Sequence, residues 1–256
     1  MSLRLEGKVA IVTGGASGYG KGIASKLKAE GAQVLLLDLN TSLGNQTATE
    51  LDVTFLKADV TVRSDWEHAL KAAIDTYGKL DIIVNNAGVS HDQKATETTT
   101  VADFDKCFGV NVKSLFLSST VLLPYLLEKK SSAAFISIAS TGGIRPRPGL
   151  TWYSASKAAV NTASNAMAVE YASRGIRFNT VCPVAGLTDM TKTILGPDEL
   201  ESGFLKTIPA GRLCTPADVG SAVCYLASDE ANFITGVNLP FAAKTSLNPS
   251  RQVMDS

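Results

Sequence analysis

The sequence predicts an α/β fold: one doubly wound parallel sheet of about seven strands, with helices on both faces. Short apolar runs alternate along the chain with longer helical patterns, which is the order that crossover helices between parallel strands produce. The runs are apolar at nearly every residue, so we expect strands that are covered on both faces. No Pro-, Gly- and Ser-rich linker divides the 256 residues, so we expect residues 1–256 to form a single domain.

The expected elements follow one another in chain order. A first strand covers 9–12, and the helix after it ends at Gly31, a residue that suits a helix C-cap. Ser64 opens a later helix with the spacing of a capping box, while Thr215 is the expected cap of another helix that has Pro216 in its first turn. Further strands are expected at 33–38, 53–58, 80–84, 134–138, 176–181 and 234–239, and further helices at 64–77, 112–128, 153–172 and from 215 onward.

Composition excludes several classes of function. The 24 Lys and Arg residues balance the 24 Asp and Glu residues, which leaves no basic surplus for nucleic acid. The four Cys and two His form no Cys-x-x-Cys or His-x-x-x-His pair, so we expect buried reduced thiols and no metal site. The most apolar stretch, 115–127, falls short of the roughly 18 apolar residues of a membrane-spanning helix. No signal-peptide pattern is found either, so we expect a cytoplasmic protein without membrane contact.

A glycine-rich turn follows the first strand. Gly14, Gly18 and Gly20 fit the pattern Gly-x-x-x-Gly-x-Gly and open a helix. Glycines there allow a tight turn and a close approach to a pyrophosphate, which binds at the helix N-terminus. A turn that only needs positive φ would also use glycine, but the position between strand and helix favours a cofactor site. Ser17 and Tyr19 lie in the same turn and are further candidate cofactor contacts.

Asp38 ends the second strand, 20 residues after Gly18. A carboxylate at this place can accept hydrogen bonds from the adenosine ribose hydroxyls and would repel a 2′-phosphate. Ser17 and Leu39 stand at the two positions where an Arg or Lys would hold that phosphate. NAD(H) is therefore favoured over NADP(H), and an ordinary strand-end turn residue is the alternative interpretation of Asp38.

Several motifs follow one another along the chain. They are Thr13-Gly-x-x-x-Gly-x-Gly20, Asn85-Asn86-Ala87-Gly88, Asn111, Ser140 and Tyr153-x-x-x-Lys157. With these motifs the sequence resembles the short-chain dehydrogenase/reductase family. The resemblance covers about residues 5–240 and implies a Rossmann-like fold and hydride transfer with a nicotinamide cofactor.

The last of these motifs suggests proton transfer. Tyr153 and Lys157 are four residues apart and share a helix face, where the cation would lower the phenol pKa from about 10. Tyr153 could then accept or donate the substrate proton. The resemblance implies that Lys157 also binds the nicotinamide ribose, that Ser140 donates to the substrate oxygen, and that Asn111 holds a water that relays protons. The alternative interpretation gives these residues no catalytic role. Tyr153 would then be a core residue, Lys157 would extend its charged end to solvent, and Ser140 would lie in a polar turn.

The resemblance assigns further cofactor contacts. They are Asp59 and Val60 at the adenine, Asn86 and Gly88 beside the adenosine ribose, and Pro183 and Thr188 at the nicotinamide end. Two features depart from the family pattern: Val184 replaces a glycine, and the tail after Leu239 is atypical. The family implies a homodimer or homotetramer that uses the helices at 112–128 and 153–172, whose apolar faces could also be plain core.

We therefore expect an NAD(H)-dependent alcohol dehydrogenase or carbonyl reductase that acts on a small-molecule secondary alcohol or ketone. A dinucleotide-binding regulator without turnover, or a non-redox enzyme of a biosynthetic pathway, are the alternatives. The irregular stretch 185–211 is the expected substrate loop. Other candidate pocket residues are Ser90, His91 and 141–152. His91 would line the pocket or lie in a surface loop, and Trp152 would line the pocket or pack. Arg145 and Arg147 would either hold an anionic group or lie in a solvated loop.

Overall fold

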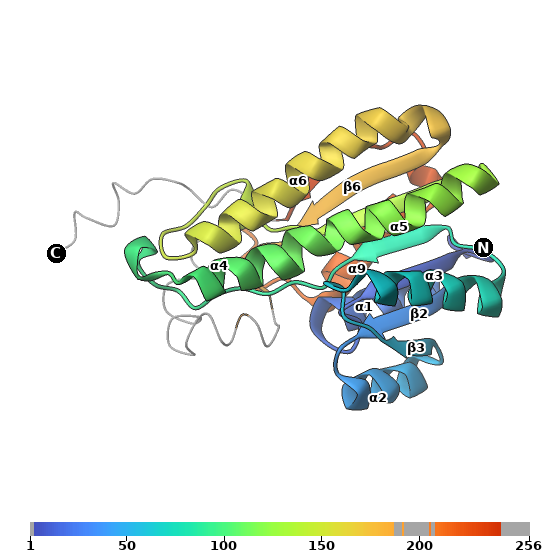
Figure 1. Cartoon of the computed structure of the whole chain (residues 1–256), viewed down its shortest axis with the longest axis horizontal. Helices are drawn as coiled ribbons and strands as arrows, with labels where there is room; N and C mark the ends of the chain where they lie inside the picture. The colour runs from blue at the N-terminus through green and yellow to red at the C-terminus, as the bar shows by residue number, and fades with distance from the viewer. Residues whose placement is uncertain (1–2, 187–190, 192–204, 206–207, 242–256) are drawn as a thin grey trace.

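All seven described strands run parallel in one sheet, in the order β3-β2-β1-β4-β5-β6-β7 (Figure 1). The computed structural model describes residues 3–186, 191, 205 and 208–241. The predicted fold class is confirmed. The strands are β1 Val9–Thr13, β2 Gln33–Asp38, β3 Thr54–Lys57, β4 Ile82–Asn85, β5 Ala133–Ile138, β6 Ile176–Cys182 and β7 Asn238–Pro240.

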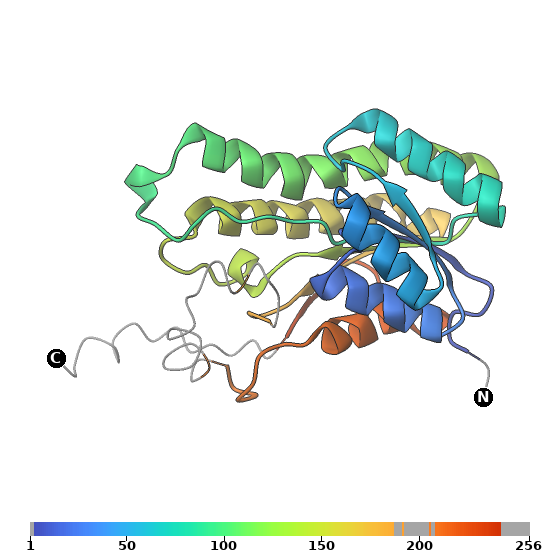
Figure 2. The ribbon, with the colours of Figure 1, turned by 90° about the horizontal axis from the view of Figure 1, so that it is seen from below.

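Helices cover both faces of the sheet, with α1 and α9 on one side and α3, α5 and α6 on the other (Figure 2). The α-helices are α1 Gly18–Ala29, α2 Thr41–Leu51, α3 Arg63–Tyr77, α4 Val101–Phe108, α5 Ser114–Lys129, α6 Thr151–Tyr171 and α9 Pro216–Ala227. A π-helical segment, η2 Gly109–Lys113, joins α4 to α5, and the 3₁₀ turns are η1 Thr96–Thr98, η3 Thr141–Gly143, η4 Ala172–Arg174 and η7 Asp229–Ala231.

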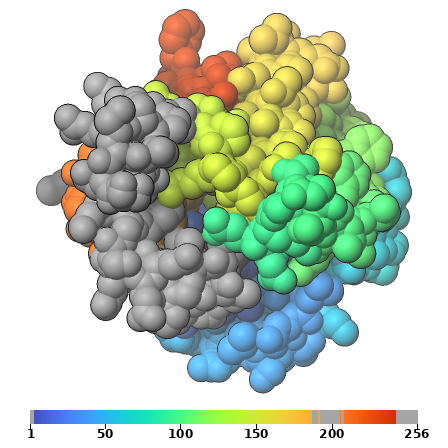
Figure 3. Space-filling model, turned by 90° about the vertical axis from the view of Figure 1, so that its left-hand side faces the viewer, coloured from blue at the N-terminus to red at the C-terminus, as the bar shows by residue number. Residues whose placement is uncertain are grey.

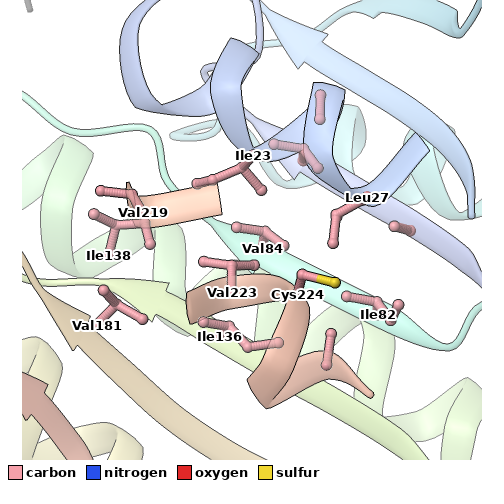
Figure 4. Packing of buried hydrophobic residues seen from close by; sticks show 14 of the residues in the cluster. Ile23, Leu27, Ile82, Val84, Ile136, Ile138, Val181, Val219, Val223 and Cys224 are labelled. Carbon is pink, nitrogen blue, oxygen red and sulfur yellow. The ribbon is translucent and has the colours of Figure 1, made fainter. Parts of the chain in front are cut away.

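Two apolar cores, one on each face, hold the layers together. On the first face Ile23 of α1 and Val223 of α9 meet Val84 and Ile136 of the central strands (Figure 4). On the other face the Phe135 and Phe178 rings stack with centroids 4.5 Å apart, and Trp66 is fully buried with them. Because the strands contribute side chains to both cores, their sequences are apolar throughout.

Three element predictions were wrong or incomplete. Helices α2 and α4 were not expected, and the last strand begins at Asn238 rather than at 234. Helix α3 begins at Arg63, and its N-cap Val62 makes no side-chain cap, so the predicted Ser64 capping box is absent. The Asp65 carboxylate accepts a hydrogen bond from the Asp59 N–H at 2.7 Å and so ties the helix start to the end of β3. By contrast, the expected cap at Thr215 is present as a full capping box with Asp218.

The helix expected at 112–128 belongs to a continuous helix that covers Val101–Lys129. By length and composition this helix could cross a membrane, but more than half of its most apolar window is buried inside the protein. Leu122 and Leu126 are fully buried against the sheet. Such burial is typical of a core helix.

The topology has a switch point between β1 and β4, where a ligand crevice is expected. The chain proceeds outward from β1 through β2 to β3, and then returns to β4 on the other side of β1. In open α/β sheets, ligands bind outside the carboxyl ends of the strands at such a switch point. Gly14 directly follows β1 and Asn86 directly follows β4, so both motifs meet there.

Candidate active site

The glycine turn brings the end of β1 against the start of α1. Gly14 and Gly18 have φ values of 61° and 54°, in the left-handed region that favours glycine. A Cβ atom on Gly20 would overlap the carbonyl oxygen of Gly14. The turn therefore favours glycine at Gly14 and Gly18 through its backbone angles and leaves no room for a side chain at Gly20.

The start of α1 is suited to an anion. Ser17 is the N-cap, yet its side chain makes no capping hydrogen bond, and the first turn contains no acidic residue. By contrast, α4 and α9 each begin with a Thr–Asp capping box. The first N–H groups of α1 thus have no side-chain acceptor at the positive end of the helix dipole, which fits the pyrophosphate of a dinucleotide.

Asn86 fastens the end of β4 to the glycine turn. Its side-chain amide donates to the carbonyl oxygens of Thr13 at 2.8 Å and Gly14 at 3.1 Å. In return, the Thr13 hydroxyl accepts from the N–H groups of Asn86 and Ala87, both at 3.0 Å. These bonds hold the two strand ends that border the crevice.

Asp38 lies beside the same turn. One carboxylate oxygen accepts from the Ala16 N–H at 3.0 Å, and the other accepts from the Asn40 N–H at 2.9 Å. The neighbouring Leu39 side chain is exposed. The carboxylate is therefore fixed at the end of β2, next to the glycine turn.

Asp59 and Val60 shape the end of β3. The Asp59 carboxylate accepts from both the N–H and the hydroxyl of Thr61, at 2.8 and 2.7 Å. Val60 is buried, and its carbonyl accepts from the Trp66 indole at 3.0 Å. Both residues hold the β3 exit, at the same edge of the sheet as the glycine turn.

Ser140, Tyr153 and Lys157 come together from two elements. Ser140 follows β5, and its hydroxyl accepts from the Gly142 N–H at 3.0 Å and is hydrogen-bonded to the Tyr153 hydroxyl. Tyr153 lies in the first turn of α6, and Lys157 lies one turn later with its ammonium buried. A Cβ atom on Gly88 would lie only 3.0 Å from Lys157 Nζ, so the loop after β4 closes over the lysine.

The electrostatics of this group differ from the expectation. Burial raises the pKa of Tyr153, and the hydrogen bond from Ser140 offsets only part of that effect. Burial also lowers the pKa of Lys157 to about 8, and its Nζ donates to the Ile138 carbonyl at 2.8 Å. The predicted lowering of the Tyr153 pKa by Lys157 is therefore wrong for this structure, because burial raises that pKa.

Asn111 connects the loop after β4 to α6. It lies in the π-helical segment, where its Oδ1 accepts from the Val89 N–H at 2.8 Å. Its Nδ2 donates to the Val89 carbonyl and to Ser156 Oγ, both at 2.9 Å, and Ser156 in turn donates to the Tyr153 carbonyl at 2.7 Å. The Asn111 amide thus positions its neighbours. The sequence reasoning missed the role of Ser156, although this residue lies inside the Tyr-x-x-x-Lys motif.

The surroundings of His91 and Trp152 bear on whether each residue lines the pocket, lies in a surface loop or packs against the protein. His91 is buried rather than exposed, and its Nδ1 lies 2.7 Å from the Asp92 carbonyl oxygen. Trp152 packs edge-on against Phe104 with ring centroids 5.3 Å apart, so it packs against α4.

Figure 3 views the edge where the strands end, and the green residues around α4 and the yellow-green residues after β5 border a recess there.

The β6 exit contains the remaining predicted contacts. The Pro183 carbonyl accepts from the Thr141 N–H at 3.0 Å, so β6 and the segment after Ser140 are joined. Val184 is a core residue, which explains how the chain accommodates it in place of the family's glycine. Thr188 lies outside the described residues, as does most of the expected substrate loop.

Metal ligation finds no support in the part of the chain that the structure describes, where no group of three or more His, Cys, Asp or Glu side chains could hold an ion. The four cysteines, Cys107, Cys182, Cys214 and Cys224, are free and buried.

Comparisons with known proteins agree with this site. A family model described as "Enoyl-(Acyl carrier protein) reductase" matches residues 14–242. The chain is 42% identical to 4-formylbenzenesulfonate dehydrogenase of Comamonas testosteroni, over 93% of this chain and 97% of that protein. It is 38% identical to 2,5-dichloro-2,5-cyclohexadiene-1,4-diol dehydrogenase of Sphingobium indicum, over 94% and 96% of the two chains.

A solved structure extends the likeness to the cofactor. The 3-ketoacyl-(acyl-carrier-protein) reductase from Brucella melitensis, complexed with NADH, superposes with a TM-score of 0.89 at 36% identity. The match covers 95% of this chain and 100% of the other. Together with the glycine turn and the motifs that meet at the switch point, these likenesses identify the chain as a member of the short-chain dehydrogenase/reductase family, a hydride-transferring oxidoreductase that uses a nicotinamide cofactor.

Proposed function

We propose that this protein transfers hydride between NAD(H) and a secondary alcohol or its ketone, with Tyr153 as the general acid and base. One observation carries the proposal: the Tyr153 hydroxyl is hydrogen-bonded to Ser140 at the carboxyl edge of the sheet, one helical turn from the buried Lys157. This edge also holds the glycine turn, so the proton-transferring group and the cofactor turn border one crevice.

Each residue has a distinct part in the proposed reaction. The bound nicotinamide supplies or accepts the hydride. The raised pKa of Tyr153 keeps its phenol neutral near pH 7, which is the form that can protonate the substrate oxygen during reduction. Ser140 donates a hydrogen bond to the same oxygen and stabilises its developing charge. Lys157, protonated below its pKa of about 8, stabilises the phenolate that forms when Tyr153 gives up its proton.

The preference for NAD(H) is proposed from Asp38. Its carboxylate accepts hydrogen bonds from the N–H groups of Ala16 and Asn40, which hold it beside the glycine turn. A negative charge held there repels a 2′-phosphate and accepts hydrogen bonds from ribose hydroxyls. The solved relative in complex with NADH supports the same choice.

The substrate class is proposed from the relatives. One named relative is a dehydrogenase of a cyclic diol, and another, from Xanthobacter autotrophicus, is a 2-(R)-hydroxypropyl-CoM dehydrogenase that is 37% identical to this chain. Each of these names contains a secondary alcohol. A medium-sized secondary alcohol or ketone is therefore our proposal for this protein.

The proposal is tested by following reduced-nicotinamide absorbance with a panel of secondary alcohols and ketones, with NAD(H) and NADP(H) in parallel. We expect turnover with at least one medium-sized substrate, at higher kcat/KM with NAD(H). If the protein bound NADH but turned over none of the panel in either direction, the regulatory alternative would be favoured instead.

A further inference from the structure

Tyr19 lies inside the glycine turn but reaches a different part of the molecule. It is the second residue of α1, and its ring packs against the core on the α1 and α9 face. Its hydroxyl donates to the Val184 carbonyl at 3.3 Å and lies beside Cys214. Tyr19 therefore links the cofactor turn to the segment that follows β6 and to the segment that precedes α9.

The hydroxyl occupies a place shaped for it. A Cβ atom on Gly186 would overlap the Tyr19 oxygen, and it would also lie 2.6 Å from the Cys214 carbonyl oxygen. Gly186 and Cys214 form an isolated parallel bridge, in which the Cys214 N–H donates to the Ala185 carbonyl at 3.2 Å. Three segments that are distant in sequence thus meet at one phenol oxygen.

Burial and neighbouring groups keep this phenol a neutral donor. Burial raises the pKa of Tyr19 well above its usual range, and the nearby Cys214 and Tyr153 add to the increase. One turn further along α1, a Cβ on Gly22 would overlap Pro216 of α9, so both helices start in close contact.

We propose that Tyr19 is a positioning residue that transmits dinucleotide binding at the glycine turn to the junction formed by Val184, Gly186 and Cys214. A dinucleotide that orders the first turn of α1 also fixes the Tyr19 ring, because the ring belongs to that turn. The hydroxyl then fixes the main chain of the junction, because it donates to the Val184 carbonyl. This inference rests on the proposed cofactor site and not on the identity of the alcohol.

The test uses the reactivity of the Cys214 thiol, which is buried beneath Tyr19. The variant Tyr19→Phe keeps the ring and loses only the hydroxyl. The control is Tyr77→Phe, because the Tyr77 hydroxyl also contacts a main-chain carbonyl, that of Val34 in β2 at 3.3 Å, together with the Thr54 hydroxyl of β3 at 2.6 Å, and so lies away from the junction. The labelling rate of Cys214 with a small maleimide is measured by peptide mass spectrometry with and without NADH, and NADH binding is measured by fluorescence.

In the native protein we expect NADH to slow the labelling of Cys214. In Tyr19→Phe the labelling without cofactor should be about fivefold faster, the factor that corresponds to one lost hydrogen bond. NADH should still bind to this variant but protect Cys214 much less, whereas Tyr77→Phe should behave like the native protein.

Two results would overturn the inference: NADH that binds the native protein without slowing the labelling, or a Tyr19→Phe variant with native labelling and native protection. Neither result touches the proposed hydride transfer, which is measured separately by absorbance. If the native protein did not bind NADH at all, the proposed function and this inference would both be wrong.

Discussion

Lys157 is a cation in a buried position, and its proton equilibrium should be visible in the stability of the protein. Its pKa is about 8 when folded and 10.5 when unperturbed, so the folded protein releases this proton more readily than the unfolded chain. The burial cost of the charge is therefore fully present below about pH 8 and is relieved as the pH rises towards 10.5.

We expect Lys157→Met to remove this pH-dependent part of the stability. Between pH 7.5 and 9.5, the native protein should gain on the order of 2 kcal/mol from Lys157 relative to the variant. Urea unfolding at several pH values measures the difference. Lys71→Met is the control, since Lys71 is exposed and pairs with Asp75 on the protein surface. A difference between native protein and Lys157→Met that stayed constant across this range would show that the folded-state pKa is not lowered.

Asp38 provides the second prediction at this scale. The double variant Asp38→Asn, Leu39→Arg keeps the side-chain oxygen that accepts from Ala16 but replaces the negative charge by a positive one next to it. We expect the ratio of kcat/KM for NADP(H) to that for NAD(H) to rise by at least about tenfold. Asp52→Asn, an exposed change at the end of α2, should leave the ratio unchanged. An unchanged ratio in the double variant would remove Asp38 from cofactor selection.

Single residues show clearly where prediction from sequence ends. The motif positions Ser140, Tyr153 and Lys157 could be identified because their spacing is local. The bonds of Asn111 to Val89 and Ser156 could not, because they depend on a π-helical turn that displaces Asn111 from a regular helix. The reach of Tyr19 to Val184 also joins segments that are distant in sequence.

At the scale of elements, the buried strands were easier to predict than the peripheral helices. Helix α2 has the sequence TSLGNQTATEL, in which few apolar residues mark a buried face. Helix α4 carried a usable signal, because Thr100 and Asp103 have capping-box spacing and form the box. The same signal failed at Ser64, since a tertiary contact of Asp65 replaced the local cap. Cap patterns therefore need agreement with the packing around them.

We expect Thr100→Ala to weaken the start of α4. The Thr100 hydroxyl accepts from the Asp103 N–H at 3.2 Å, and the Asp103 carboxylate accepts from the Thr100 N–H at 2.9 Å. Loss of the cap should cost about 1 kcal/mol in the free energy of unfolding, measured by urea denaturation. Thr49→Ala, within α2, is the control, and a Thr100→Ala cost no larger than the control's would contradict the role of the cap.

At the scale of the whole molecule, the continuous apolar strands and the strand–helix alternation were sufficient to predict the sheet. Right-handed crossovers restrict such a chain to few topologies, so the site could be expected at the strand ends. The final strand could not be placed, because it pairs over only three residues with β6 and follows a turn at Gly236, whose φ is 77°. The apolar pattern from residue 234 onward does not show where the turn ends and where the pairing with β6 begins.

We propose that the protein is a homodimer or homotetramer that assembles through α5 and α6, which lie side by side on one face (Figure 1). Phe116 on α5 is 60% exposed and Val169 on α6 is 86% exposed. Large apolar side chains exposed together on one face are typical of an interface between subunits. We expect the molecular mass measured by light scattering to be a multiple of 26.9 kDa. The double variant Phe116→Glu, Val169→Glu should have a lower measured mass. The control Leu43→Glu on α2 should leave the measured mass unchanged. A native protein that is monomeric would contradict the proposal.

The central claim is that Tyr153 moves the substrate proton, and one measurement tests it most directly. Tyr153→Phe keeps the ring of this residue and removes the hydroxyl that is bonded to Ser140. The measurement is the turnover rate with NAD(H) and the best alcohol, made alongside a calorimetric titration with NADH. We expect turnover to fall by roughly 10³-fold, within the range of general acid–base catalysis, while NADH affinity stays nearly unchanged. Native turnover in Tyr153→Phe would contradict the mechanism.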